Sequence, residues 1–257
     1  MKLIACCKVV PDEQDITINA DRSLSVDNAG LKISLYDLNA LEAAADIVRE
    51  RAGSTLTALS VGGKTRLENS KIRKDILSRG PDDLVLVADD ACRDLLPAET
   101  AKLLAQAAWK IGFDLIICGE GSGDLYAQQT GLLVGERLGV PCINAVSNIT
   151  LGDGVITVER ELEDEVEVLE ITLPAVISVT SDINTPRLPA MKAILAASKK
   201  PVTQWSLAEA GGGVERAAAA CVSIQAPEQT DRLRAIIEGD SEADIAALAH
   251  NIQQALH

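Results

Sequence analysis

The chain has 257 residues, of which 47% are hydrophobic and only 2% aromatic, and its formal net charge is −14. A chain of this length and apolar content can bury a substantial core, which excludes a disordered protein. The excess of negative charge and the scarcity of aromatic rings argue against a nucleic-acid partner.

The cysteines and histidines restrict the chemistry further. The six cysteines form no C-x-x-C pair and only two histidines accompany them, so we expect no metal site. Cysteines within apolar runs are typical of a reduced compartment, so we expect a cytoplasmic protein. No apolar run is long enough to cross a bilayer and the first is too short for a signal peptide, so we expect no membrane insertion.

Strand and helix patterns alternate along the first 140 residues. Ser34 is a predicted N-cap, Leu35, Leu38 and Leu41 follow at helical spacing, and Gly53 marks the end of that helix. The predicted strands span residues 3–10, 55–63, 83–89 and 113–119, and the predicted helices span 35–53, 66–80, 97–112 and 132–139.

This alternation predicts a doubly wound α/β fold with a mainly parallel sheet, Rossmann-like and similar to adenine-nucleotide α-hydrolases. In such a fold the ligand crevice lies at the carboxyl ends of the strands. Those ends are Cys6–Cys7, Val61–Gly63 and Gly119 onward. Adjacent residues of a strand point to opposite faces, so we expect Cys6 and Cys7 to pack in the core and not to form a reactive pair.

The pattern changes in the second half of the chain. Residues 154–180 alternate like a β-hairpin with the acidic Glu163–Glu165 at or near its turn. The last part is Gly/Ala-rich and then amphipathic, so we divide the chain into a nucleotide-binding domain, 1–195, and an extension, 196–257, that packs on a partner subunit.

The stretch GEGSGDLYAQQTG, residues 119–131, is the main candidate site. Small residues between a strand and a helix let backbone N–H groups approach an anion, and the helix dipole favours negative charge there. The alternative is an ordinary helix cap with glycines for turn geometry. Asp124 lies within the turn and would compete with a phosphate for the same donors. Residues 60–63, SVGG, are a second candidate for backbone contact with a nucleotide, with a plain turn as the alternative.

The sequence shows no catalytic apparatus beside this turn. His250 and His257 lie in the C-terminal tail, no P-loop lysine follows the glycines, and no paired-carboxylate pattern stands out. We therefore expect a nucleotide-holding protein and not an enzyme. Residues 181–201 combine prolines, apolar residues and a basic end, which fits either a protein-docking segment or a core helix after a loop.

Together these segments resemble the β subunit of electron transfer flavoproteins. The resemblance covers residues 1–200 and is most specific within residues 158–179, where the family's signature spacing is matched by Val158, Arg160, Glu163, Asp164, Glu165, Glu167, Leu169 and Pro174. The phrases DEQDI, RKDILSRGPDDL and SGDLYAQQTGLLVGE resemble an enteric branch linked to anaerobic carnitine and acyl-CoA metabolism, akin to the nitrogen-fixation type.

The resemblance implies a heterodimer in which an α subunit carries most of a redox FAD. The β subunit then holds a second nucleotide, which is AMP in ordinary members and a second FAD in electron-bifurcating members. Carried over by position, the nucleotide contacts are Cys6, Ser34, Val61, Gly119, Asp124, Gln128, Gln129 and Thr130, with Cys6 and Val61 acting largely through backbone.

Other positions carried over from the family concern the flavin and the redox partners. Tyr36 matches an aromatic position that faces the flavin. Met191 matches the apolar anchor that docks acyl-CoA dehydrogenases, and we group Leu188 with it. Glu161 matches a carboxylate that steers the mobile flavin domain. The implied function is electron transfer through FAD between an acyl-CoA dehydrogenase-type partner and a quinone oxidoreductase or ferredoxin-type partner.

Some positions depart from the family pattern. Ser34–Leu35 replaces Asn-Pro, and Glu120–Ser122 replaces a Lys/Arg-Gln-Ala triplet. Thr130 matches the AMP-binding type, whereas the branch resemblance favours bifurcation, so both nucleotides stay open. The alternatives from other classes are a stand-alone stress-type nucleotide-binding protein and an ATP-pyrophosphatase. The latter needs a Ser-Gly-Gly-x-Asp-Ser loop, which residues 6–15 do not contain.

Overall fold

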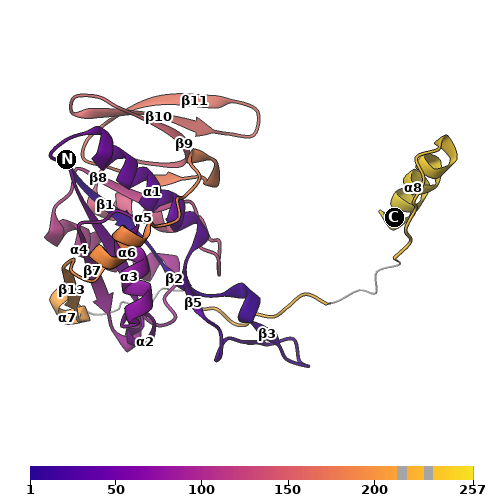
Figure 1. Cartoon of the computed structure of the whole chain (residues 1–257), viewed down its shortest axis with the longest axis horizontal. Helices are drawn as coiled ribbons and strands as arrows, with labels where there is room; N and C mark the ends of the chain where they lie inside the picture. The colour runs from indigo at the N-terminus through magenta and orange to yellow at the C-terminus, as the bar shows by residue number, and fades with distance from the viewer. Residues whose placement is uncertain (213–218, 229–233, 257) are drawn as a thin grey trace. The chain divides into compact units, whose positions relative to one another are not determined.

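A computed structural model describes residues 1–212, 219–228 and 234–256 (Figure 1). The chain divides into two compact units. The first comprises Met1–Thr17 and Ser25–Ser223, and the second comprises Ile18–Leu24 and Ile224–His257. The predicted nucleotide site and docking segment both belong to the first unit.

A nine-stranded sheet forms the centre of the first unit, in the order β11-β10-β9-β12-β8-β1-β6-β7-β13. Every neighbouring pair from β9 to β13 in that order is parallel. The parallel strands are β1 (Lys2–Cys6), β6 (Thr55–Gly62), β7 (Asp83–Ala88), β8 (Leu115–Gly119), β9 (Cys142–Leu151), β12 (Ala175–Val179) and β13 (Val202–Trp205).

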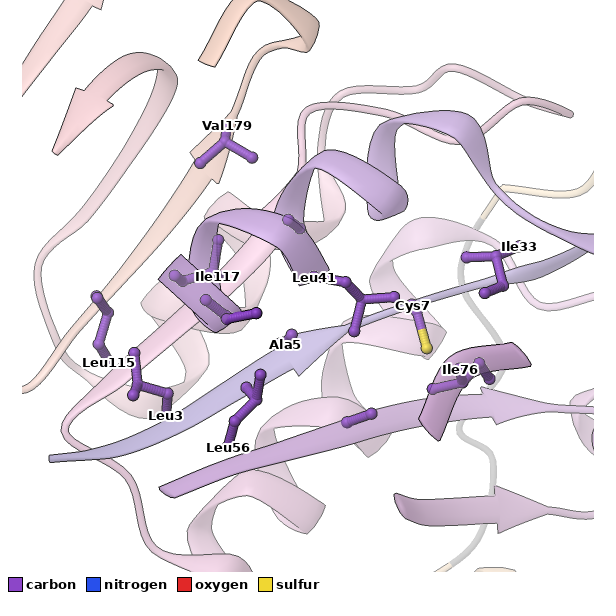
Figure 2. Close-up of a cluster of buried hydrophobic side chains, with 14 of the residues drawn as sticks. Leu3, Ala5, Cys7, Ile33, Leu41, Leu56, Ile76, Leu115, Ile117 and Val179 are labelled. Carbon is purple, nitrogen blue, oxygen red and sulfur yellow. The ribbon is translucent and has the colours of Figure 1, made fainter. Parts of the chain in front are cut away.

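Helices cover both faces of this sheet, which makes it doubly wound. On one face lie α1 (Leu35–Glu50), α3 (Ser70–Ser78) and α6 (Met191–Ala197), and on the other lie α4 (Pro97–Ile111), α5 (Thr130–Leu138) and α7 (Leu207–Ala210). Leu3, Ala5 and Cys7 of the first strand region point toward α1, as Figure 2 shows. Ile4 and Cys6 point to the opposite face. The predicted fold is therefore confirmed, as are the opposite orientations of Cys6 and Cys7.

The predicted hairpin is present at one end of the sheet (Figure 1). It consists of β10 (Val155–Glu161) and β11 (Val166–Thr172), which pair antiparallel, and β10 also pairs antiparallel with β9. The acidic Glu163–Glu165 lies in its tip, as expected. The last part of the predicted hairpin region is instead β12, which returns to the sheet beside β8 because its five residues are all buried and apolar or small.

Two predicted elements are divided in the structure. The first strand ends at Cys6, and β2 (Val9–Pro11) pairs instead with β5 (Leu31–Ile33) in a separate two-stranded sheet. The predicted helix 66–80 is two helices, α2 (Lys64–Leu67) and α3, because the Asn69 side chain accepts hydrogen bonds from Lys71 N and Ile72 N and so starts a new helix.

Short elements complete the description. They are the 3₁₀ turns η1 (Glu13–Asp15), η2 (Asp90–Cys92) and η3 (Ser181–Ile183), and the short strands β3 (Thr17–Ile18) and β4 (Leu24–Ser25). Among the described residues, no helix has both the length and the apolarity to span a membrane.

The region predicted as an extension begins with elements of the first unit. β13 pairs in parallel with β7, and Ala210 of α7 is buried against α4. The second unit contains α8 (Glu242–Ala255), whose apolar Ile245, Leu248 and Ile252 recur at helical spacing and are each at least half exposed. That α8 packs on a partner subunit stays a prediction.

The close approach of α5 to the sheet generates a testable prediction. A Cβ atom built at Gly131 would collide with Ser178 Oγ of β12. We expect Gly131→Ala to lower the free energy of unfolding by about 1–3 kcal/mol, measured by urea denaturation.

The double variant tests the cause of that loss. Once Ser178→Ala has removed the hydroxyl, the nearest remaining contacts of the new Cβ are at 3.4 Å, an ordinary packing distance. Adding Gly131→Ala to that background should then be neutral or stabilising, because alanine favours a helix over glycine by about 1 kcal/mol. An equal loss in both backgrounds would contradict the proposed steric cause.

Candidate functional site

The strand order reverses between β1 and β8, and the ends of these strands are where a doubly wound sheet is expected to form its ligand crevice. From β1 the chain proceeds to β6 and β7 on one side and then returns to β8 on the other side of β1. The segment after β1 leads to α1 on one face, whereas the segment after β8 leads to α5 on the opposite face. In doubly wound sheets, ligands bind where adjacent connections diverge in this way.

A buried carboxylate joins the two strand ends that border this crevice. Asp37, in the first turn of α1, accepts hydrogen bonds from Lys8 N at 2.7 Å and from Gly119 N at 3.3 Å. The residue is only 7% exposed, and its burial raises the pKa of the carboxyl to about 7, against the opposing effect of these two hydrogen bonds. Asp37 therefore fixes the end of β1, the end of β8 and the start of α1 relative to one another.

Gly119 is the residue at which α1 comes closest to β8. A Cβ atom here would lie 2.6 Å from the carbonyl carbon of Tyr36 and 2.7 Å from Asp37 Oδ1. Backbone atoms cannot yield as a flexible side chain can, so a larger residue would separate α1 from the strand. The packing of α1 against β8 is by itself sufficient to require the glycine.

The predicted turn continues from Gly119 and is attached to both α1 and the segment after β1. Ser34 Oγ accepts a hydrogen bond from Gly123 N at 3.2 Å, and Lys8 Nζ forms an ion pair with Asp124 at 2.7 Å. Ser34 occupies the N-cap position of α1 as predicted, but its side chain makes no cap hydrogen bond and holds the turn instead.

The pairing with Lys8 changes how Asp124 affects an anion. Burial opposes ionisation of the Asp124 carboxyl, but the Lys8 ammonium and the hydrogen bonds from Ser122 and Leu125 N together hold its pKa below the ordinary value. Asp124 is therefore ionised near neutral pH and its charge is balanced by Lys8 within the fold. The expected competition between this carboxylate and a phosphate is correspondingly reduced.

Two aromatic rings meet over the turn. Tyr36 and Tyr126 have ring centroids 4.9 Å apart with planes inclined by 38°, and Gln128 Nε2 donates to the Tyr126 hydroxyl at 3.3 Å. Tyr126 and Gln128 both have positive φ, at 44° and 55°. Such conformations cost about 1–3 kcal/mol each and gather at ligand-binding segments. Gly121 permits the arrangement, since a Cβ there would enter the Tyr126 ring.

The start of α5 supplies the donors that an anion needs. Gln129 stands at the N-cap position without a side-chain cap hydrogen bond, and Thr130 begins the helix. Gln128 and Gln129 are exposed and Thr130 is half-buried. Backbone N–H groups at such a helix start, with amide and hydroxyl donors beside them, suit the phosphate of an adenine nucleotide. The donor set therefore fits the nucleotide that the resemblance implies.

Cys6 and Val61 lie at the ends of two neighbouring strands, β1 and β6. The Cys6 side chain faces away from α1, and a hydrogen bond with the Cys118 thiol together with burial raises its pKa well above the ordinary value. The thiol is thus an inert part of the core. Val61 packs half-buried against the same cluster. Contact of Cys6 and Val61 with a nucleotide through their backbone stays a prediction.

The predicted docking residues are exposed. Leu188 is 90% exposed, Met191 is 70% exposed, and Glu161 is an exposed residue at the end of β10. The alternative for residues 181–201, a core helix, does not hold because Ala197 alone is buried among the residues of α6.

Three residues of the crevice escaped the sequence analysis. The sequence pattern predicts Lys8 as part of a continuous strand, Asp37 as an ordinary residue of a helix, and Tyr126 as part of a polar turn. A signal existed for Asp37, because a carboxylate in the first turn of a helix interacts favourably with the dipole. The long-range contacts of Lys8 and Tyr126 have no comparable local signal.

The fold defines a doubly wound α/β protein whose candidate ligand site lies at the point where its strand order reverses. A comparison with protein families identifies the group more closely, because residues 23–210 match the model of the electron transfer flavoprotein domain. The match spans most of the chain, so the chain belongs to the electron transfer flavoprotein domain family. The family is flavin-associated, and its members act in electron transfer and not as enzymes in their own right.

The buried Asp37 carboxyl predicts a pH dependence of stability. An aspartate in the unfolded chain ionises near pH 3.8, whereas Asp37 in the native state holds its proton up to about pH 7. Between these values the native state binds more protons than the unfolded state. The free energy of unfolding should therefore fall as pH rises from about 4 to about 7, by up to about 1.4 kcal/mol per pH unit.

Asp37→Asn isolates this contribution. An asparagine cannot ionise, so we expect the variant to be less stable at low pH but to lose less stability as pH rises to 7. Urea denaturation at several pH values between 4.5 and 7.5 measures both slopes. The groups acting electrostatically on Asp37 are Lys8 and Asp124, with the thiols of Cys6 and Cys7 near it, and all of these remain in the variant. If stability falls equally steeply with pH in both proteins, groups other than Asp37 cause the pH dependence.

Proposed function

We propose that this chain is the β subunit of an electron transfer flavoprotein heterodimer. The observation that carries the proposal is the family match combined with the signature segment 158–179, which forms the hairpin and β12. With an α subunit, the complex would pass electrons between an acyl-CoA dehydrogenase-type protein and a quinone oxidoreductase or ferredoxin-type protein. A cytoplasmic role in anaerobic carnitine or fatty-acid metabolism is the pathway that the branch resemblance favours.

The crevice would hold a nucleotide without transforming it. FAD shared with the α subunit supplies the redox chemistry. In this chain, Thr130 and the exposed Gln128 and Gln129 would hold phosphate at the start of α5, while Ser34 fixes the turn and Tyr36 offers an aromatic face. Stabilising a phosphoryl-transfer transition state calls for cationic groups and metal ions directed at the phosphate. The Lys8 ammonium is already paired with Asp124 in this crevice, which favours holding over transfer.

The bound nucleotide would be AMP or a second FAD. Thr130 favours AMP, as in members with one flavin, and the branch resemblance favours a second FAD and electron bifurcation. The Tyr36–Tyr126 pair supports either, because an aromatic face packs against an adenine as well as an isoalloxazine ring.

The surface elements would serve the partners. Leu188 and Met191 supply exposed apolar side chains for the dehydrogenase, and Glu161 at the acidic hairpin tip would steer the flavin domain of the α subunit. The apolar stripe of α8, formed by Ile245, Leu248 and Ile252, would pack on the α subunit, because an amphipathic helix buries its apolar face against another surface.

The nucleotide content of the complex tests the first part of the proposal. The chain is co-expressed with its α subunit, and the bound nucleotides are released by denaturation and quantified. We expect one FAD and one AMP, or two FAD, per heterodimer. Gly119→Ala should remove only the nucleotide of this chain, because the new Cβ separates α1 from β8 at the crevice. The FAD of the α subunit serves as the internal control.

The same measurement separates the rival functions. A stable isolated chain without flavin, or unchanged nucleotide content in the Gly119→Ala complex, would contradict the proposed role. Release of pyrophosphate from ATP by the chain alone would favour an ATP-pyrophosphatase instead.

The docking residues give a kinetic prediction. Met191→Ala and Leu188→Ala should each raise the KM of an acyl-CoA dehydrogenase for the flavoprotein by about tenfold, because exposed apolar anchors contribute most to such contacts. The flavin content should not change. Val222, which is 96% exposed, supplies the matched control as Val222→Ala. A KM unaffected by both docking variants would place the interface elsewhere.

A further inference from the structure

The segment that carries the exposed docking residues is irregular in structure but firmly attached. Between η3 and α6, residues 184–190 form neither helix nor strand. Even so, this loop and the 3₁₀ turn before it are tied to α1 by side chains from two successive turns of that helix. Residues 181–191 are called the docking segment below.

Asn39 makes the first attachment. Its side-chain amide donates to the carbonyl oxygens of Ser181 at 3.2 Å and Asn184 at 2.9 Å, and the Asn184 amide donates in return to the Asn39 carbonyl at 3.1 Å. Asn39 is only 3% exposed. Buried amides left without partners are costly, so these hydrogen bonds specify one conformation of the segment.

Glu42 makes the second attachment, one helical turn later. Its side chain is 8% exposed and accepts hydrogen bonds from Arg187 Nε at 2.5 Å and from Arg187 N at 3.3 Å. The Arg49 guanidinium also lies 3.3 Å from Glu42. Charge-assisted hydrogen bonds in a largely buried setting are among the stronger ones in proteins. The residue that follows Arg187 is Leu188, which projects into solvent.

The two attachments therefore lie on one face of α1, because residues three apart on a helix are neighbours. They hold both the backbone at Ser181–Asn184 and the residue immediately before the apolar anchor. The loop has little burial of its own, since Leu188 and Met191 are mostly exposed. Pro186 and Pro189 restrict the backbone of this loop locally. Its attachment to the rest of the unit comes mainly from Asn39 and Glu42, with Arg79 donating to the Arg187 carbonyl at 3.5 Å.

We propose that Asn39 and Glu42 are positioning residues that pre-organise the docking segment and hold Leu188 and Met191 ready for the partner. This inference rests on the docking function proposed above. A loop ordered before binding spares the complex the conformational entropy of ordering it during association. Side chains of α1 thus hold Leu188 and Met191 in position, and the first turn of the same helix borders the nucleotide crevice.

Hydrogen–deuterium exchange on the purified heterodimer tests the positioning directly. We expect Asn39→Ala and Glu42→Gln to speed amide exchange in peptides covering residues 181–191 by about tenfold or more. Arg187→Gln breaks the ion pair with Glu42 by changing its more exposed partner. This variant keeps the test valid if a substitution at the buried Glu42 prevents folding. Glu50→Gln removes an equal charge from the exposed last residue of α1 and should leave exchange unchanged.

The KM of an acyl-CoA dehydrogenase for the same heterodimers tests whether positioning serves docking. We expect Asn39→Ala and Glu42→Gln to raise KM about five- to tenfold with kcat and nucleotide content unchanged. Unchanged exchange in all three variants would overturn the inference, and so would faster exchange with an unchanged KM. The docking function is tested separately by Met191→Ala and Leu188→Ala. If neither of these variants changes the KM, the proposed docking function is wrong, whatever the exchange measurements show.

Discussion

The structure depends on one interaction between a buried carboxylate and two backbone amides. Asp37 binds Lys8 N and Gly119 N with its two oxygens, so a single side chain joins the start of α1 to the ends of β1 and β8. β1 and β8 pair in the sheet, but the chain segments that follow them lead to opposite faces. Asp37 links these segments beyond the strand pairing, as do the contacts of Ser34 with Gly123 and of Lys8 with Asp124. The Asp37 link also places Lys8 where its ammonium can neutralise Asp124 of the turn. The shape and the charge of the crevice thus have a common origin.

The fold could be predicted from the sequence because its signals are local and repeated. Apolar runs such as residues 115–118, together with glycine stops such as Gly139, mark strands and helices by short-range chemistry. The break after Cys6 could not be predicted, because it depends on Asp37, 29 residues away from Lys8. The division at Asn69 was visible in principle, since an asparagine that caps a helix has a recognisable local role.

The same distinction between local signals and long-range contacts applies to the candidate site. Glycines between a strand and a helix single out the turn as a candidate, and apolar residues after prolines single out residues 181–201. The choice of Met191 as the docking residue rests on the family resemblance. The attachments of Ser34 to Gly123 and of Asn39 to Asn184 join residues far apart in sequence. Such contacts produce no periodic pattern in the sequence, so they could not be predicted from it. The family resemblance named Ser34 and Gly119 as ligand contacts, and the structure adds that both also hold the crevice together.

The acidic hairpin has a consequence for how copies of the chain meet. β11 is the outermost strand of the sheet, and the edge of a sheet is a template on which another strand can pair. Exposed Val166 and Val168 give this edge apolar side chains that favour pairing, but Glu165 and Glu170 flank them. Glu167, between the two valines, is paired with Arg160 of β10 at 3.1 Å. Two such edges placed side by side would set carboxylates against carboxylates. The strand therefore discourages homotypic pairing and aggregation, while a basic surface could approach the same edge without that repulsion.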